Sequence, residues 1–416
     1  MRIAVIGSGG REHAIVEALA REKSHEIFVF PGNGGTAAVA KNIPVGGDKS
    51  KEIFSAVMEH RCEMAVIGPE KPLVDGLADR LRGEGLIVLG PGAGAARIEG
   101  SKVWAKQFME RHGIPTAAHR VFDSFEEARY YIRNEKKYPL VIKADGLAAG
   151  KGVIIASSPE EAEQALLNIM VEKQFGTAGD LVEIEEFLRG RETSYLVFCD
   201  GESFLPMATS KDYKKVYDGD RGLNTGGMGT FSPSPLVDER LEKTIQETII
   251  RKAVEGFKKD GIPFTGVLYA GLMLTDRGPK VLEFNCRFGD PETQVILSRL
   301  KTPLSRVIRA VHEKKLHTMT LEWDERAAVC VIAASAGYPG TYQKGKPVTG
   351  LENVKHAKVY HAGTQRRDGK VYTSGGRVLG VTALGSSLEE ARIAAYKELE
   401  KITFEGIYYR KDIGSF

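Results

Sequence analysis

Two oxygen-bearing side chains stand out in the run VLEFNCRFGDPET over residues 281–293. In an extended strand Glu283 and Asn285 are two residues apart, so they project to the same face. A carboxylate beside an amide oxygen suits Mg²⁺, which keeps waters and substrate phosphates as its other ligands. Arg287 continues that face, and its guanidinium can bind a carboxylate or a phosphate. The alternative is the polar face of an edge strand, which the Gly-Asp-Pro-Glu turn that follows disfavours.

A lysine followed by a glycine-rich loop forms a second candidate site, KADGLAAGKG over residues 143–152. It is not a P-loop, because Asp145 replaces a required glycine, Gly152 replaces the required Ser or Thr, and the loop joins strand to strand. Lys143 can still supply charge to nucleotide phosphates, and the loop amides can donate hydrogen bonds to them. A mobile surface hairpin is the alternative, and this motif alone leaves both open.

Four glycine-containing turns follow apolar runs in the first hundred residues, at 7–10, 31–36, 68–70 and 90–92. The first, GSGGREH, differs from a dinucleotide-binding loop because Glu12 takes the place of the third glycine. The second run ends in Pro-Gly-Asn, without an acidic residue for a ribose. Backbone amides at a helix N-terminus suit a phosphate, so we expect an anion site here. A tight turn without a ligand is the alternative.

Two further segments have both a structural and a functional interpretation. The run EEFL at 185–188 is typical of solvated carboxylates at a strand edge, or of a backbone that contacts adenine, with Glu192 on the ribose. Residues 208–231 are polar and glycine-rich, and we expect a long loop that is either functional or disordered. Lys211, Asp212 and the stretch 224–229 would let that loop close over a substrate.

The elements that position these residues follow from the hydrophobic pattern. Short apolar runs at 3–6, 27–30, 64–67 and 86–89 alternate with helical periodicity, for instance at 12–22 and 73–82, which predicts a parallel sheet with crossover helices. Serines followed three residues later by glutamate predict helix starts at Ser124, Ser158 and Ser387. Further strands and one helix are expected at 140–144, 153–156, 193–198, 204–208, 241–259 (the helix), 266–274 and 280–285, and a strand-rich region from about 325.

Composition excludes several protein classes. The chain has 416 residues with 58 Lys+Arg against 55 Asp+Glu, a balance that gives no reason to expect a nucleic-acid partner. Its four cysteines are far apart and form no C-x-x-C pair, which fits a reducing cytoplasm. No apolar run approaches 18 residues, so we expect no membrane span.

The order of these motifs resembles the ATP-grasp superfamily and, more closely, the glycinamide ribonucleotide synthetases of purine biosynthesis. The resemblance rests on GSGGREHA, PGNGGT, IKADGLAAGKGV, IEEFL, NTGGMG, EFNCRFGDPETQ and the terminal RKDIG, which occur in the family's order over nearly the whole chain. It implies an α/β and α+β multidomain protein: an ATP-grasp fold with an N-terminal parallel-sheet (pre-ATP-grasp) domain and a C-terminal strand-rich domain. The expected domains are residues 1–100, a small lid at 118–188, a central unit at 101–117 plus 189–322, and residues 325–416.

The resemblance also implies a reaction and a role for each candidate residue. ATP, glycine and 5-phosphoribosylamine would give glycinamide ribonucleotide, ADP and phosphate through a glycyl phosphate. Mg²⁺, with Mn²⁺ as the alternative ion, would be held by Glu283 and Asn285. The expected ATP contacts are Lys102, Lys143, Gly146, Gly150, Lys151, Gly152, Glu185, Glu186, Phe187, Leu188 and Glu192. The expected substrate contacts are Gly9, Gly10, Arg11, Asn33, Gly34, Glu70, Asn224, Gly226 and Gly227. Arg287, Asp290 and Asp212 are the candidates for holding glycine and its acyl phosphate.

One departure from the superfamily pattern leaves the number of metal ions open. Many ATP-grasp enzymes have another metal carboxylate about a dozen residues before the E-x-N pair, where this chain has Tyr269-Ala270-Gly271. Either another acid such as Asp290 substitutes, or a second ion relies on ATP and water.

Three competing functions stay open at this point: another ATP-grasp ligase or carboxylase, a nicotinamide-dependent oxidoreductase and a non-catalytic nucleotide sensor. We expect a monomer or a small homo-oligomer.

Overall fold

The N-terminal domain is built on a parallel sheet whose strand order is β3-β2-β1-β4-β5. The computed structural model describes residues 1–45, 49–147 and 152–415. The predicted apolar runs are strands buried on both faces, as helices on either side of a parallel sheet require. The elements are β1 (Arg2–Gly7), α1 (Gly10–Ala20), β2 (Glu26–Pro31), β3 (Lys41–Asn42), α2 (Ser50–Glu59), β4 (Met64–Ile67), α3 (Glu70–Val74), α4 (Leu77–Gly83), β5 (Ile87–Leu89) and α5 (Ala93–Gly100).

Two details of this domain differ from the expected pattern. The helix expected over 73–82 is two helices, α3 and α4, because Gly76 between them has a left-handed backbone with φ +78°. The helix α2 is one of the expected crossover helices, although its bounds were not predicted, and the short strand β3 was not predicted because it has no apolar run.

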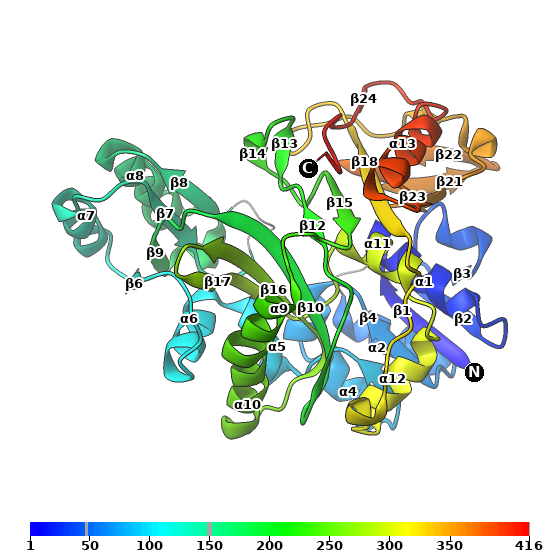
Figure 1. The fold of residues 1–416 in the computed structure, drawn as a ribbon, viewed down its shortest axis with the longest axis horizontal. Helices are drawn as coiled ribbons and strands as arrows, with labels where there is room; N and C mark the ends of the chain where they lie inside the picture. Colours follow the sequence, from blue (N-terminus) through cyan, green and yellow to red (C-terminus); the bar gives the residue numbers. More distant parts are fainter. Residues whose placement is uncertain (46–48, 148–151, 416) are drawn as a thin grey trace.

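A separate small subdomain projects from one end of the molecule (Figure 1). Its antiparallel sheet has the order β6-β9-β7-β8, and its apolar residues form a core of their own. The predicted caps are present, because the Ser124 and Ser158 hydroxyls accept hydrogen bonds from the backbone N–H of Glu127 and Glu161. The elements from 102 to 186 are α6 (Lys102–Arg111), β6 (His119–Phe122), α7 (Phe125–Asn134), β7 (Leu140–Ala144), β8 (Val153–Ala156), α8 (Pro159–Leu166) and β9 (Val182–Glu186).

The central unit joins this subdomain to the rest through a four-stranded sheet of order β11-β10-β16-β17. Side chains from both faces of β10 and β16 pack into cores shared with the N-terminal domain, so the two units have a common hydrophobic interior. The elements are β10 (Arg191–Asp200), β11 (Phe204–Pro206), α9 (Glu239–Ile245), a π-helical turn (Gln246–Ile250), α10 (Arg251–Lys259), β16 (Thr265–Thr275), β17 (Gly278–Asn285), α11 (Glu292–Arg299) and α12 (Leu304–His312).

The C-terminal sheet recruits strands from the middle of the chain. Its order is β12-β15-β18-β23-β20. The segment 208–231, which we expected to be a loop, is about half strand, because β12 and β15 join this sheet and β13 and β14 pair with each other. Phe231 is fully buried in this sheet's core, which local composition does not reveal. The elements are β12 (Lys211–Asp212), β13 (Lys215–Tyr217), β14 (Arg221–Asn224), β15 (Gly229–Ser232), β18 (Ala327–Ser335), β19 (Pro347–Val348), β20 (Lys358–His361), β21 (Thr364–Arg367), β22 (Lys370–Thr373), β23 (Arg377–Gly385), α13 (Leu388–Leu399) and β24 (Ile407–Tyr408).

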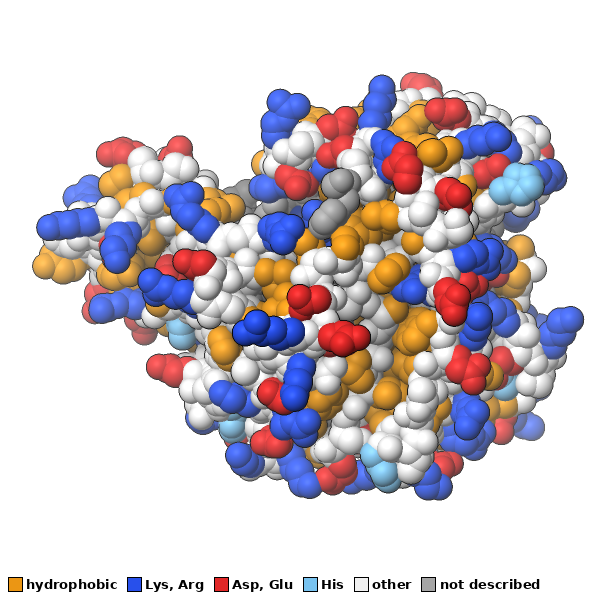
Figure 2. All heavy atoms as spheres, viewed as in Figure 1, with side chains coloured by type: hydrophobic (Ala, Val, Ile, Leu, Met, Phe, Trp, Pro, Cys, Tyr) orange, Lys and Arg blue, Asp and Glu red, His pale blue; other side chains and the backbone are white. Residues whose placement is uncertain are grey.

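The surface and the cysteines agree with the composition. Basic and acidic side chains alternate over the face seen in Figure 2, without a broad patch of one sign. All four cysteines are buried and unpaired. Among the described residues, the structure has no helix that is both long and apolar enough to cross a membrane. The predicted domain limits remain predictions, and the pairing of β15 with β18 crosses the limit expected near 325.

Candidate active site

Two predicted ATP-binding lysines lie where the small subdomain meets the central unit. Lys102, at the start of α6, donates to the carbonyl of Gly146 at 2.8 Å, and Gly146 has a left-handed backbone with φ +90° that only glycine adopts easily. Lys143, on β7, donates to the carbonyl of Leu282 on β17 at 3.3 Å. Gly152 accepts a hydrogen bond from the backbone of Ala144, whereas Gly150 and Lys151 lie outside the described residues. The subdomain is therefore joined to β17 through one of these lysines.

A buried carboxylate fixes the second of these lysines. Glu185 contacts the ammonium of Lys143 at 2.5 Å and that of Lys106, on α6, at 3.1 Å. Burial alone would lower the pKa of Lys143, but Glu185 and Glu183 raise it above its usual value. Lys106 and Glu183 were not among the predicted site residues. The only signal that the sequence offers is their spacing: Lys106 lies four residues after Lys102, and Glu183 lies two residues before Glu185.

The predicted adenine-binding segment follows this cluster at the end of β9. The Glu186 carboxylate points outward, accepting from the backbone N–H of Ala118 at 3.0 Å and pairing with Lys280 at 2.8 Å. Leu188 is buried in a small cluster with Met273, and the ring of Phe187 lies 5.9 Å from the guanidinium of Arg189. Because these three side chains already have partners within the protein, the backbone of the segment, rather than its charged groups, is available to a ligand.

The expected metal strand is β17, whose partner β16 lies antiparallel to it. Gly271 is opposite Glu283 and Tyr269 opposite Asn285, so the three residues that lack an acid face the E-x-N pair directly. The Glu283 side chain is about half exposed (47%), and its carboxylate lies 3.8 Å from the ammonium of Lys214. Lys214 also lies 3.6 Å from Glu192, the residue expected on the ribose.

The charges around this strand are strongly coupled. Although burial raises the pKa of Glu283, Lys214, Lys143 and Lys102 together hold it below its usual value. Burial raises the pKa of Asp212 to about 7, against the opposing effect of Lys214. Lys214 itself, in spite of burial, has its pKa raised by Asp212 and Glu192. The carboxylates that act on Lys214 are Asp212, Glu192, Glu283 and Glu292.

These oxygen donors fit a Mg²⁺ ion that relies on phosphates and water for its remaining ligands. Among the described residues no group of three or more His, Cys, Asp or Glu side chains is arranged to hold a metal. One ionised carboxylate beside one amide is nonetheless the donor set through which Mg²⁺ binds together with a substrate's phosphates. Glu283 and Asn285 therefore fit a nucleotide-borne ion better than a permanently held one.

The glycine turn after β1 is already occupied by a side chain of the protein. The backbone N–H of Gly9 donates to Glu12 Oε2 at 2.6 Å, and Arg11 pairs with Glu12 Oε1 at 2.6 Å. A Cβ on Gly7, Gly9 or Gly68 would collide with the Glu12 side chain, so these glycines provide the space that it fills. An anion at this turn thus meets Arg11 and the remaining amides with Glu12 beneath them.

Two predicted substrate contacts, Asn33 and Gly34, also contact residues of the C-terminal region. The Asn33 amide nitrogen donates to the carbonyls of Ser8 at 2.9 Å and of His361 at 2.7 Å, and its oxygen accepts from the N–H of Gly35 and Thr36. The N–H of Gly34 donates to the carbonyl of Thr364 on β21 at 3.2 Å. Asn33 has all its hydrogen-bonding capacity in use, so a substrate would have to displace one of these partners.

Arg287 and Asp290 connect the central unit to both flanking domains. Arg287 pairs with Glu70 at the start of α3 at 3.1 Å and with Glu99 on α5 at 2.7 Å. Asp290 pairs with Arg377 on β23 at 3.3 Å and accepts from Gln294 at 2.8 Å. These contacts bring Glu70, Arg287 and Asp290 to one side of the Gly9 turn.

The remaining predicted contacts lie at the rim formed by the C-terminal sheet. Arg377 donates to the carbonyl of Gly226 at 2.6 Å and to that of Asp290 at 2.7 Å, while the N–H of Gly226 donates to the hydroxyl of Tyr338 at 3.0 Å. A Cβ on Gly227 would lie 2.5 Å from the Pro291 ring. Asn224 pairs with Lys215 across the β13–β14 hairpin. This glycine stretch therefore abuts Asp290 through backbone contacts that tolerate no side chain at Gly227.

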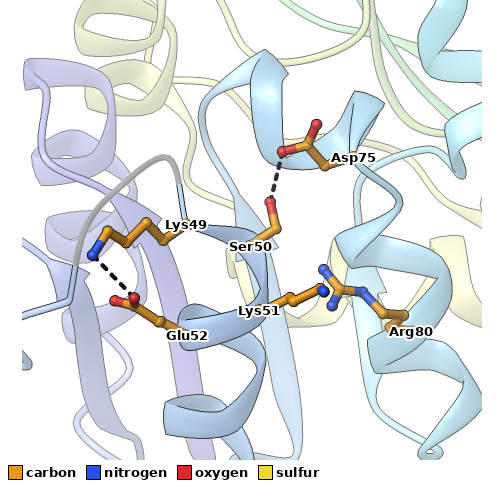
Figure 3. A pocket seen from close by; sticks show the side chains of 6 residues that line it. All are labelled: Lys49, Ser50, Lys51, Glu52, Asp75 and Arg80. Carbon is orange, nitrogen blue, oxygen red and sulfur yellow. Dashed lines mark hydrogen bonds and ion pairs between the residues drawn. The ribbon is translucent and has the colours of Figure 1, made fainter.

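A separate hollow of about 610 Å³ lies in the N-terminal domain, between α2 and the α3–α4 pair (Figure 3). Ser50 donates to Asp75 at 3.0 Å and Lys49 pairs with Glu52 at 3.0 Å. None of the predicted site residues is among those that line it, which are Lys49, Ser50, Lys51, Glu52, Asp75 and Arg80.

Comparison with known proteins gives matches over most of the chain. The descriptions that match are "Phosphoribosylglycinamide synthetase, N domain" over residues 1–99, its "ATP-grasp (A) domain" over 100–293 and its "C domain" over 328–416. A phosphoribosylamine–glycine ligase of Caldanaerobacter subterraneus subsp. tengcongensis is 50% identical over 416 residues, 100% of both chains.

Solved structures agree with the sequence relatives. The phosphoribosylamine–glycine ligase of Thermotoga maritima superposes with a TM-score of 0.88 at 39% identity, over 99% of this chain and 100% of that one. The biotin carboxylase domain of 2-oxoglutarate carboxylase from Hydrogenobacter thermophilus, determined with the magnesium salt of ADP and with bicarbonate, gives 0.75 at 15% identity. It covers 98% of this chain and 91% of that one, and at so low an identity it shows a shared fold alone.

Proposed function

The chain belongs to the phosphoribosylglycinamide synthetase family, and from this membership we propose how its cleft joins glycine to 5-phosphoribosylamine. The protein is a carbon–nitrogen ligase of purine biosynthesis with an ATP-grasp fold. The observation that carries the site assignment is the placement of lysines around Glu283: the ammonium of Lys214 lies 3.8 Å from its carboxylate, and Lys143 and Lys102 also act on that carboxylate electrostatically. Such an arrangement of lysines can balance the negative charge of a tetra-anionic nucleotide that carries Mg²⁺.

The proposed reaction has two displacements. The glycine carboxylate attacks the γ-phosphorus of ATP, ADP leaves, and glycyl phosphate forms. The amine of phosphoribosylamine then attacks the carbonyl carbon, phosphate leaves, and the amide bond of glycinamide ribonucleotide is formed. Phosphoryl transfer of this kind needs positioning and charge neutralisation more than a covalent nucleophile of the protein.

The chain's own residues take the following proposed roles. Lys102 and Lys143 hold the ATP phosphates, the backbone of 185–188 holds adenine, and Glu192 binds the ribose. Glu283 and Asn285 would hold Mg²⁺, which would supply positive charge beside the phosphates, and Mn²⁺ would be the alternative ion. Arg11 and the Gly9–Gly10 turn bind the phosphoribosyl group.

The acyl-transfer side of the cleft has its own proposed set. Arg287 and Asp290 orient glycine between the phosphoribosyl turn and the metal strand, with Glu70 fixing the guanidinium of Arg287. Asp212 and the 224–227 stretch close the opposite side. We further propose that the protein works in the cytoplasm as a monomer or small homo-oligomer on small molecules alone, without a nucleic-acid partner.

Release of ADP in a coupled assay, with phosphoribosylamine generated in situ, tests this function. Repeated turnover to ADP should require both glycine and phosphoribosylamine, because without the amine the glycyl phosphate is not consumed, and omission of glycine is the control. ADP release with bicarbonate in place of glycine would instead support the alternative, an ATP-grasp carboxylase.

A further inference from the structure

Four charged side chains are buried together beneath the proposed nucleotide site. Lys106, Lys143, Glu183 and Glu185 have exposed fractions of 2%, 8%, 0% and 2%. They come from three elements, α6, β7 and β9, and Lys143 is paired directly with Glu183 in the β7–β9 register. Glu183 and Glu185 are two residues apart on β9, so their carboxyl groups share a face.

The two carboxyl groups are not equivalent. Glu185 takes both ammonium groups, at 2.5 Å from Lys143 and 3.1 Å from Lys106. Glu183 comes within 3.7 Å of Lys106, and both of its carboxyl oxygens are shielded from solvent and accept no hydrogen bond. Lys106 therefore lies closer to Glu185 than to Glu183, and its ammonium also donates to the hydroxyl of Thr116 at 2.7 Å.

An ionised carboxylate in this position would be a buried charge without a hydrogen bond, which is strongly unfavourable. A neutral carboxyl group avoids that cost, because its O–H can donate to the neighbouring carboxylate of Glu185. Two carboxyl groups held this close share one proton for the same reason that like charges cannot both ionise in one site. Burial, and then Glu185, raise the pKa of Glu183 to about 8.

We propose that Glu183 carries a proton at neutral pH, donates it in a hydrogen bond to Glu185, and thereby leaves one excess positive charge beside Lys143 for the nucleotide phosphates. Glu183 is a positioning residue in this scheme, since it acts on the nucleotide through Glu185 and Lys143. The inference rests on the proposed binding of ATP in this cleft.

The other charged groups around Glu183 are consistent with this balance. Lys102 on α6 also interacts electrostatically with it, and Lys143 in turn interacts with Glu283 on β17. His119 lies opposite Glu185 on β6, and burial lowers its pKa, so it is neutral over the pH range in which Glu183 titrates. Among the carboxyl groups of the cluster, Glu183 is thus the one whose titration changes its charge near pH 8.

An anionic nucleotide should bind the protonated cluster more tightly than the deprotonated one. Binding must therefore draw a proton into the protein at pH values near and above the pKa of Glu183, as linkage requires. Phosphate groups with a second pKa near 6 are fully ionised at that pH and supply no proton themselves.

Isothermal titration calorimetry with MgADP at pH 8.5, in buffers of different ionisation enthalpy, measures this proton directly. The wild-type protein should take up a fraction of one proton per MgADP, and its Kd should rise by up to about tenfold per pH unit at higher pH. Glu183→Gln, which keeps a neutral donor of the same shape, should bind MgADP with no proton uptake and a Kd that changes little with pH. Glu126→Gln, at an exposed glutamate of the same subdomain, is the matched control and should behave as wild type.

The outcomes separate the inference from the proposed function. Equal proton uptake by wild type and Glu183→Gln, or none by wild type although MgADP binds, would overturn the inference alone. Failure of the wild-type protein to bind MgADP would overturn the nucleotide assignment together with it. If thermal unfolding shows that Glu183→Gln does not fold, the wild-type protein alone tests the inference. Its Kd for MgADP must then rise with pH, and it must take up protons when MgADP binds.

Discussion

The carboxylate of Glu283 is the residue on which the proposed metal chemistry depends most directly. Its pKa is held low by three lysines, so it is ionised throughout the neutral range. Glu283→Ala should lower kcat by more than the roughly 100-fold typical of residues that only support a metal ligand. The unfolding temperature should be nearly unchanged, because the side chain is about half exposed.

Steady-state kinetics with saturating ATP and glycine check this loss of turnover. Glu325→Ala, at an exposed glutamate outside the cleft, is the control and should retain full activity. Near-normal turnover of Glu283→Ala would remove Glu283 from the metal site.

Lys143 gives a second prediction at the scale of one side chain. Loss of a charged hydrogen bond to a phosphate costs about 1.5–3 kcal/mol, so Lys143→Ala should lower kcat/KM for ATP by about 10- to 100-fold. The change for glycine should be smaller. The comparison with Lys136→Ala, an exposed lysine of the same subdomain, separates a role in the site from a general effect of charge. An unchanged KM and kcat for ATP would show that the strand lysine has no such role.

At the scale of the element, the turns of the N-terminal sheet are shaped around the Glu12 side chain. A Cβ on Gly68 would collide with the Glu12 carboxylate, which caps α1 through Gly9. Gly68→Ala should therefore destabilise the protein by about 1–3 kcal/mol and raise KM for phosphoribosylamine, because Glu12 can move only at the expense of the cap.

Urea unfolding and the coupled assay measure the two effects. Gly83→Ala is the matched control, since a Cβ there meets nothing within 4 Å and alanine favours the helix in which Gly83 lies. Equal stability of the two variants would show that Glu12 does not need the space that Gly68 leaves.

Some elements of this fold can be predicted from the sequence, and others cannot. The strands β4, β7 and β8 match the predicted runs residue for residue, because each is a short apolar segment bounded by glycine or polar residues. The segment 208–231 could not be predicted in this way, because β12 pairs with β15 and β15 pairs with β18, which lies nearly a hundred residues later in the chain.

In the candidate site, too, only residues that form a local pattern can be recognised from the sequence. Glu283 and Asn285 could be recognised from their alternation on one strand, which is a local property. Lys106, Glu183 and Lys214 could not, because their importance comes from burial and from partners on other elements. Asn33 lies in a glycine turn that is easily recognised, but the carbonyls to which its amide nitrogen donates lie outside that turn, two in the turn after β1 (Ser8 and Gly9) and one in the C-terminal region (His361).

At the scale of the molecule, a pair of buried histidines joins the two ends of the chain. The backbone N–H of His361 on β20 donates to Nδ1 of His13 on α1 at 2.8 Å, so His13 must be neutral there. Burial lowers the pKa of His13 to about 4 and that of His361 to about 3.

The sign of the resulting pH dependence follows from these shifts. Between pH 6.5 and 4 the unfolded chain binds protons that the folded protein excludes, so the free energy of unfolding falls as the pH falls. For His13 alone the loss is on the order of 3 kcal/mol across that range. His13→Asn, whose side-chain oxygen can accept the same hydrogen bond, should reduce this slope in urea titrations at pH 4.5–7. His317→Asn, at an exposed histidine, should leave it as in wild type, and equal slopes for all three proteins would contradict the prediction.

The recruitment of β12 and β15 into the C-terminal sheet has a consequence for synthesis on the ribosome. At about 5–20 residues per second, β15 emerges roughly 5–20 s before β18, the strand that covers it. During that interval Phe231, fully buried in the finished protein, has no partner sheet to bury it. During each round of translation the nascent chain therefore exposes an apolar strand for several seconds. A chaperone would have its largest apolar binding surface at that stage.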